Sequence, residues 1–351
     1  MKKLLKYTVL AGVVLSYSSA IAGNEDRVGS AGATQLLINP WARSLAIGDA
    51  GVASTRGLEA TFTNIAGLAF TEKTQIKFNY TNWMGSAGVP LNAAGIAQRI
   101  NESSVIAVSI QSMNFGDVQI TTTDLPEGGI GVFSPRLNVF NVGYAKSFSS
   151  SIYGGINFKV LSENISNLKA NGIAFDAGIR YVTGEQEQIK FGIALKNVGP
   201  VMRYKGDGLS QEVTNITTGG ISTLEQRSAT FELPSLLNIG GSYDFNFNEA
   251  NKLIVNASFT ANSFQKDQFR IGLDYGMTLD KAAFNVRCGY VAEKFILSAE
   301  NRTNALTGFV AGFSADALVG KNKTALGIEY AMRFAGQFGV IHTFGTTISL
   351  K

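Results

Sequence analysis

Long segments of this chain alternate between apolar and polar residues, and this period of two restricts the possible folds more than any other feature. In residues 173–181, apolar side chains at every second position alternate with small or charged ones. The same alternation recurs in residues 189–196, 269–277 and 326–334. Such a pattern predicts strands with one apolar and one polar face. Beyond the N-terminus, no stretch approaches the roughly 20 apolar residues of a membrane-spanning helix.

The length of these segments distinguishes two kinds of β-protein. They extend over about 9 to 14 residues, whereas strands of soluble proteins typically have five or six. A bilayer requires tilted strands of about 9–11 residues. Backbone groups in hydrocarbon must all be paired, so such a sheet has to close into a barrel. The alternative, a soluble β-sandwich or solenoid, would have shorter strands and more closely spaced turns.

We therefore predict an all-β protein, a 14-stranded antiparallel transmembrane β-barrel. The predicted strands are residues 74–83, 88–99, 104–114, 137–147, 152–163, 172–182, 189–198, 232–246, 252–262, 269–279, 284–293, 305–316, 323–333 and 337–350. When the strands are counted from the periplasm, the two longest connections, 115–136 and 199–231, both fall on the outer side. Long outer loops and short periplasmic turns are typical of outer-membrane barrels.

The first 22 residues have the features of a secretory signal peptide. Three lysines precede an apolar stretch, which is followed by small residues ending in Ala20-Ile21-Ala22. A retained N-terminal anchor is the alternative interpretation. Removal of this segment takes away three lysines and no acids, so the formal net charge falls from +4 to +1. The mature chain therefore gives no indication of a nucleic-acid partner.

The scarcity of reactive residues excludes several classes of function. With one cysteine and one histidine, the chain can form neither an internal disulfide nor a Cys/His zinc site, and we expect no metal and no cofactor. A Ser-His-Asp mechanism would have to use His342, which falls in the apolar register of the last strand. Cys288 likewise lies in an apolar register and is interpreted as a small hydrophobic residue. We therefore predict a protein that is not an enzyme.

Residues 23–73 precede the predicted barrel and contain two motifs. The first is Pro40-Trp41-Ala42-Arg43-Ser44-Leu45-Ala46-Ile47-Gly48-Asp49-Ala50-Gly51-Val52-Ala53, and the second is Phe62-Thr63-Asn64-Ile65-Ala66-Gly67-Leu68-Ala69. These motifs resemble the N-terminal signature of the PorV/PorQ family of Bacteroidota outer-membrane proteins. That family is itself similar to the long-chain fatty-acid transporter (FadL-like) barrels.

The match to this family has three departures. Trp41 replaces the usual glycine, Ile47 the usual methionine, and Ile65 the usual proline. Loss of that proline frees the φ angle at the turn. The sequence of residues 35–40 is more similar to PorV than to PorQ members of the family. A divergent paralogue would account for the sequence as well as PorV itself.

The segment 23–73 is expected to enter the lumen as a plug or hatch, with residues 74–351 forming the barrel. The alternative is an additional periplasmic strand and turn. Glycines allow tight bends and close backbone approach, and the charged residues can pair with opposite charges on the wall. The motif residues to which we assign these roles are Arg43, Gly48, Asp49, Gly51, Asn64 and Gly67.

Charged residues recur on the polar face of six predicted strands. They are Lys77, Asp176, Arg180, Lys190, Lys196, Arg270, Asp274, Arg287, Glu329 and Arg333. Two interpretations stay open: a salt-bridged interior that supports the plug, or a cationic lumen that concentrates an anionic ligand such as a fatty-acid carboxylate. An acid/base pair among the three carboxylates has no spacing to support it.

The two long outer connections are where binding specificity is expected. Candidate contact residues are Asp124, Leu125 and Pro126 in the first connection, and Tyr204 and Asp207 in the second. These segments are either mobile surface loops or a docking surface for another protein.

The resemblance implies a function in type IX secretion. PorV-like members lack a known catalytic activity, dock beside the large translocon barrel and receive cargo by its C-terminal domain. An accessory or cargo-shuttle barrel that contacts outer-membrane lipid is thus the leading hypothesis. The second is a FadL-like transporter of hydrophobic solutes, which requires an apolar pocket near the hatch and a break in the barrel wall. A purely structural barrel is the third.

Overall fold

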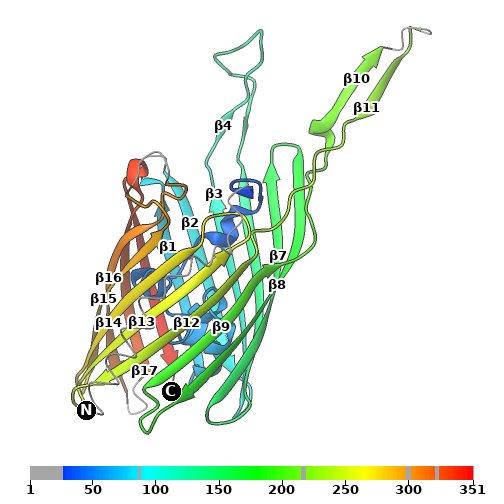
Figure 1. Cartoon of the computed structure of the whole chain (residues 1–351). Coiled ribbons are helices and arrows are strands. Elements are labelled where there is room, and N and C mark those ends of the chain that lie inside the picture. Colours follow the sequence, from blue (N-terminus) through cyan, green and yellow to red (C-terminus); the bar gives the residue numbers. More distant parts are fainter. Residues whose placement is uncertain (1–26, 86–87, 215–218, 298–301, 321–323, 351) are drawn as a thin grey trace.

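The protein is a closed β-barrel whose lumen holds the residues that precede the first strand (Figure 1). The computed structural model describes residues 27–85, 88–214, 219–297, 302–320 and 324–350, so the predicted signal peptide lies outside the described residues. None of the helices in the described residues is long and apolar enough to cross a membrane.

Fourteen antiparallel strands form the wall, as the alternation predicted. They are β1 (Thr74–Trp83), β2 (Val89–Arg99), β3 (Ser104–Asn114), β6 (Arg136–Ser147), β7 (Ile152–Ile165), β8 (Leu168–Thr183), β9 (Ile189–Val198), β12 (Leu236–Asn246), β13 (Asn251–Asn262), β14 (Gln268–Thr278), β15 (Ala282–Glu293), β16 (Gly308–Val319), β17 (Thr324–Phe334) and β18 (Val340–Leu350). Neighbours in the wall follow chain order, and β1 pairs with β18 to close the barrel. Every boundary lies within four residues of the predicted one.

Strand β9 illustrates how the alternation becomes an inside and an outside. Phe191, Ile193 and Leu195 are about half exposed on the outer face, whereas Lys190 and Lys196 are buried in the lumen. Large apolar side chains cover the outer face of the other strands in the same way. An outward apolar surface of this kind is stable only against lipid, so the barrel is of the outer-membrane type.

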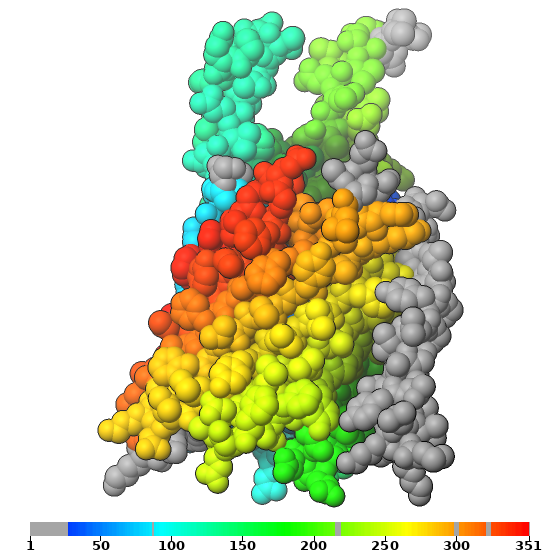
Figure 2. Space-filling view, turned by 60° about the vertical axis from the view of Figure 1, so that its left-hand side comes forward, coloured from blue at the N-terminus to red at the C-terminus, as the bar shows by residue number. Residues whose placement is uncertain are grey.

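Each of the two long connections folds into a hairpin that the sequence analysis did not predict. The first contains β4 (Val118–Gln119) and β5 (Val132–Phe133), and the second contains η6 (Asp207–Leu209), β10 (Ser210–Thr214) and β11 (Ile221–Glu225). Both hairpins rise from the same end of the barrel in Figure 1 and stand apart from one another in Figure 2. A further short helix, η7 (Gly336–Phe338), joins β17 to β18.

The N-terminal segment folds as a plug of short helices rather than as an additional wall strand. Its elements are η2 (Thr34–Leu37), α2 (Ala42–Ala46), η3 (Gly57–Thr61) and η4 (Ile65–Phe70). Trp41, Leu58 and Leu68 are at most 2% exposed and belong to a core cluster with small alanines of the wall. On Gly272 of the wall, a Cβ would lie 2.5 Å from the carbonyl oxygen of Ile47, so the plug backbone touches the wall directly.

One irregularity interrupts the ladder of the wall, between β8 and β9. The register shifts between Phe175 and Ala177, and Asn197 on the facing strand has a φ of 59°. The Asp176 carboxylate of β8 accepts a hydrogen bond of 2.7 Å from the Asn197 backbone N–H of β9 and so links the two strands at the irregularity. Strands β8 and β9 remain hydrogen-bonded on both sides of this irregularity, so the ring of fourteen strands is continuous.

Candidate functional site

A cluster of buried ion pairs joins the plug to one side of the wall. The Arg43 guanidinium lies 2.7 Å from both Asp316 and Glu329. Next to it, the Lys77 ammonium is 2.9 Å from Glu329 and also pairs with Glu59 of the plug. The side chains of Lys77, Glu59 and Glu329 are at most 4% exposed, so these charges are stabilised by one another and not by water.

A second cluster surrounds Asp49. Its carboxylate lies 2.9 Å from Arg333 and 3.8 Å from Arg270, and it accepts a hydrogen bond from the Asn39 side chain. Burial alone would raise the pKa of Asp49, but the two arginines outweigh it and hold that pKa below its usual value. The carboxylate is therefore ionised at neutral pH and fixes the turn after α2 to the wall.

The motif glycines and Asn64 shape the backbone around these charges. Gly48 and Asp49 both have positive φ angles, 67° and 60°, which turns the chain sharply. On Gly51 and Gly67, a Cβ would lie 2.4 Å and 2.2 Å from atoms of Thr55, so the plug chain packs closely on itself. The Asn64 side chain accepts from the Ala66 N–H at the start of η4 and donates to carbonyls of the plug and of β8.

Arg180 anchors the plug from β8. It is fully buried, donates to the Thr55 carbonyl and lies over the Phe70 ring at 4.9 Å from its centroid. Except for Lys196, the remaining predicted lumen charges pair with residues of the wall. Asp176 pairs with Lys159 at 2.6 Å, Lys190 with Asp244, and Arg287 with Asp274 at 3.0 Å.

These pairs reduce the expected excess of positive charge. Seven basic and three acidic side chains were predicted on six strands, whereas Asp244, Asp316 and the cation Lys159 lie on three other strands. The plug adds the acids Asp49 and Glu59 and the cation Arg43. Most of the predicted cations are thereby neutralised, and the lumen charges mainly hold the plug and the wall together.

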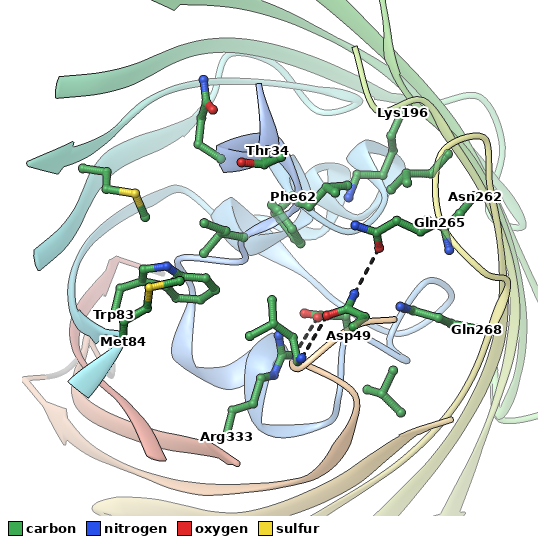
Figure 3. Close-up of a pocket in the computed structure, with 18 of the residues that line it drawn as sticks. Thr34, Asp49, Phe62, Trp83, Met84, Lys196, Asn262, Gln265, Gln268 and Arg333 are labelled. Carbon is green, nitrogen blue, oxygen red and sulfur yellow. Dashed lines mark hydrogen bonds and ion pairs between the residues drawn. The ribbon is translucent and has the colours of Figure 1, made fainter. Parts of the chain in front are cut away.

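A cavity of 270 Å³ lies in the lumen between the plug and the outer ends of the strands. Figure 3 shows Asp49 and Arg333 at one side of it and Lys196 and Phe62 at another. Its apolar lining is Leu37, Ile38, Phe62, Trp83, Met84, Met113, Phe115, Leu137, Leu236, Val291 and Leu306. Its polar lining includes Gln35, Asn262, Gln265, Gln268 and Asn304. The arrangement suits an amphiphile with an apolar body and a polar end.

Lys196 is the exceptional cation of this cavity. It is 3% exposed, and its ammonium lies 3.9 Å from the centroid of the Phe62 ring. Among the described residues, it is the member of the predicted lumen set that forms no ion pair or hydrogen bond through its side chain. A buried ammonium held by a cation–π contact alone retains capacity for an anion.

The predicted contact residues of the outer connections lie in different surroundings. Asp124, Leu125 and Pro126 are exposed at the end of the β4–β5 hairpin, and Asp207 is exposed at the foot of β10. Tyr204 is instead partly buried, packs against Phe231 and donates a hydrogen bond to Glu163. The structure therefore does not bring these five residues to one surface.

The two reactive side chains noted in the sequence lie on the outer face of the barrel. His342 Nδ1 is 2.8 Å from the Tyr330 hydroxyl, and no serine or cysteine of the described residues is bonded to it. Cys288 is partly exposed between Val286 and Tyr290. Neither arrangement resembles a nucleophile with its base.

Comparison with protein families decides where the chain belongs. Residues 21–265 match the family model of the type IX secretion system protein PorV. The chain belongs to this PorV family. No curated protein matches the sequence significantly.

Solved structures of other proteins share this fold. The toluene transporter TodX of Pseudomonas putida superposes with a TM-score of 0.54 at 11% identity, covering 89% of this chain and 98% of TodX. A FadL homologue of Pseudomonas aeruginosa gives 0.51 at 14% identity and covers 89% and 96%. The CymD monoaromatic hydrocarbon channel gives 0.53 at 11% identity and covers 89% and 96%. At these identities the likeness establishes the fold alone.

Proposed function

We propose that this PorV-family barrel is a non-enzymatic accessory or cargo-shuttle protein of type IX secretion and surface attachment. Its partners are then the type IX translocon barrel and cargo proteins that carry the C-terminal signal domain. Residues 1–22 direct its export through the Sec pathway, residues 23–73 plug the lumen, and residues 74–351 form the barrel in the outer membrane. The observation that carries the proposal is membership of the PorV family together with two outer hairpins on a plugged barrel.

The ion pairs that fix the plug favour a function in which cargo binds at the outer surface of the barrel and does not pass through its lumen. Arg43 and Asp49 each join the plug to two wall residues, and the four wall residues lie on β14, β16 and β17. Breaking a buried ion pair typically costs about 3–5 kcal/mol. A folded cargo domain is in any case far larger than the 270 Å³ cavity.

The outer hairpins are suited to hold a protein partner. Leu125, Ile130 and Val132 of the first hairpin are 50–58% exposed, and Ile221 and Leu224 of the second are 71% and 57% exposed. Exposed apolar side chains on a projecting hairpin are typical of interaction sites. Since both hairpins emerge from the outer end, a cargo domain can contact them after it has crossed the membrane.

The test is binding of an isolated type IX C-terminal signal domain to the purified barrel in detergent. Replacement of residues 118–133 or of residues 207–226 by a short Gly-Ser turn should reduce the binding affinity at least tenfold. A few central contacts usually carry most of the binding energy of an interface, and each replacement removes such contacts. Replacement of the inner turn 247–250 in the same way is the control and should leave binding unchanged. Equal binding by all variants would refute the docking model.

A second candidate function, transport of hydrophobic solutes such as long-chain fatty acids, is favoured by one observation. The lumen cavity combines apolar walls with the unpaired ammonium of Lys196, which fits a fatty-acid carboxylate and its chain. Uptake of labelled oleate by cells should then fall when Lys196 is replaced by methionine. Uptake that is unaffected even by deletion of the gene would exclude this candidate.

A further inference from the structure

A second hollow, distinct from the lumen cavity, opens at the outer rim between the feet of the two hairpins. This outer groove has a volume of 680 Å³. Its floor is the N-terminal segment 30–35, and its apolar walls come from both hairpins and from neighbouring strand ends. The wall residues used here are Phe115, Val118, Ile165, Tyr204 and Phe231. The outer groove and the lumen cavity share Thr34, Gln35, Phe115 and Leu137, so the two hollows adjoin one another.

Glu163 lies in the outer groove with its charge uncompensated. It is 3% exposed, and its carboxylate accepts hydrogen bonds from the Gln35 amide at 2.8 Å and from the Tyr204 hydroxyl. Both donors are neutral, and no lysine or arginine of the described residues pairs with it. A carboxylate offers about four acceptor positions, so capacity remains for a further donor.

Most of the other buried carboxylates of the barrel have a cation beside them. Asp49, Asp176, Asp244, Asp316 and Glu329 are each paired with at least one cation. Glu293 is a second carboxylate, 5% exposed, that accepts hydrogen bonds from neutral donors, namely the backbone N–H groups of Thr303 and Asn304 and the Thr303 hydroxyl. A buried carboxylate without a cation is costly, and the cost is recovered when a cation arrives. In the outer groove, a cation for Glu163 would be supplied by a partner, since no lysine or arginine of the described residues pairs with it.

The floor of the outer groove also offers free backbone groups. Ala31 forms a parallel bridge with Glu232, in which the Gly32 N–H donates to the Glu232 carbonyl. In a parallel bridge of this kind, the N–H and C=O of the bridged residue itself point to the opposite side. Those groups of Ala31 have no backbone partner among the described residues, so an extended segment can add to this edge.

We propose that the outer groove binds an extended segment of a partner protein, whose lysine or arginine pairs with Glu163 and whose backbone pairs with Ala31. Alternate apolar side chains of the segment pack on Phe115, Ile165 and Phe231. The inference rests on the proposed function only for the protein that supplies the segment, which is then a secreted cargo or a translocon subunit.

The experiment selects peptides from a random ten-residue phage library on the purified full-length barrel. Selected peptides should contain a basic residue within an alternating apolar pattern. Glu163→Gln keeps the size and an acceptor oxygen but removes the charge, and it should weaken these peptides by about tenfold or more. Glu127→Gln, an exposed carboxylate on the first hairpin, is the matched control and should leave affinity unchanged.

A second variant tests strand addition independently. Ala31→Pro removes the free N–H without removing a hydrogen bond to Glu232, and it should weaken the same peptides. Peptides without basic enrichment, or peptides that bind wild type and Glu163→Gln equally, would overturn the inference. Binding of the cargo signal domain that is lost with the hairpins but retained in Glu163→Gln would leave the proposed function intact and refute the groove alone.

Discussion

Lys77 of the wall pairs with Glu59 of the plug and with Glu329 of the wall, so its replacement tests how the lumen is closed. In Lys77→Met, Glu59 and Glu329 lose a cation that lies between them. Their side chains are 4% and 0% exposed, so water does not replace the ammonium. Glu329 keeps Arg43, and Glu59 keeps one hydrogen bond of 2.7 Å from the Ser44 N–H.

The magnitude follows from the charge count of this cluster. Arg43 and Lys77 face three carboxylates, those of Glu59, Asp316 and Glu329, so the variant leaves one cation for three acids. Breaking a buried pair in this way costs about 3–5 kcal/mol. With a denaturant slope of about 1–3 kcal/mol per molar urea, the urea concentration at the midpoint of plug release should fall by about 1 M or more.

Tryptophan fluorescence can follow the plug separately from the wall. The chain has two tryptophans, Trp41 in the plug at 2% exposure and Trp83 in β1. In a Trp83→Phe background, the emission of Trp41 in detergent micelles reports whether the plug is docked. Lys73→Met, at an exposed lysine just before β1, is the control. Equal urea midpoints for Lys77→Met and Lys73→Met would show that this cluster does not hold the plug.

Three other perturbations address the remaining contacts. The pKa of Asp49 is lower in the folded state than in the unfolded state, where it is about 4. The ionised carboxylate therefore stabilises the docked plug above pH 4, and this stabilisation is lost as the pH falls through the folded pKa. The Trp41 fluorescence should stay constant from pH 8 to about 4 and change only below that. Ile193→Arg, at an outward position of β9 that is 53% exposed, should destabilise the barrel in bilayers by about 2–4 kcal/mol, as measured by urea titration in lipid vesicles. Gly67→Ala would place a Cβ 2.2 Å from the Thr55 carbonyl and should release the plug at lower urea than wild type, whereas unchanged release would show that the plug adapts.

The barrel wall could be predicted because the membrane imposes one rule on every strand. Lipid requires an apolar outer face, and the closed lumen requires a polar or small inner face, so outward and inward residues of β9 alternate strictly from residue 189 to residue 196. The two outer hairpins escaped prediction for the converse reason. All five residues of β10 and all five of β11 are exposed. Because neither strand has a buried face, their sequences need not alternate between apolar and polar residues.

The partners inside the lumen could be predicted only in kind. The motif indicated that Arg43 and Asp49 would meet opposite charges, but the partners Asp316 and Arg333 lie 273 and 284 residues further along the chain. Which wall residue a plug residue meets depends on barrel closure and strand register, neither of which is local in sequence. A survey of all fourteen strands would have found Asp316 by its inward register.

Once the paired charges are set aside, two uncompensated groups of opposite sign remain in the two hollows. The Lys196 ammonium lines the lumen cavity, and the Glu163 carboxylate lines the outer groove. Gln35 of the plug lines both hollows and donates a hydrogen bond to Glu163. The two proposals therefore assign an anionic amphiphile to the lumen cavity and a basic peptide segment to the adjoining outer groove. Lys196→Met and Glu163→Gln separate the two activities, because each removes the charge from one hollow and leaves the other unchanged.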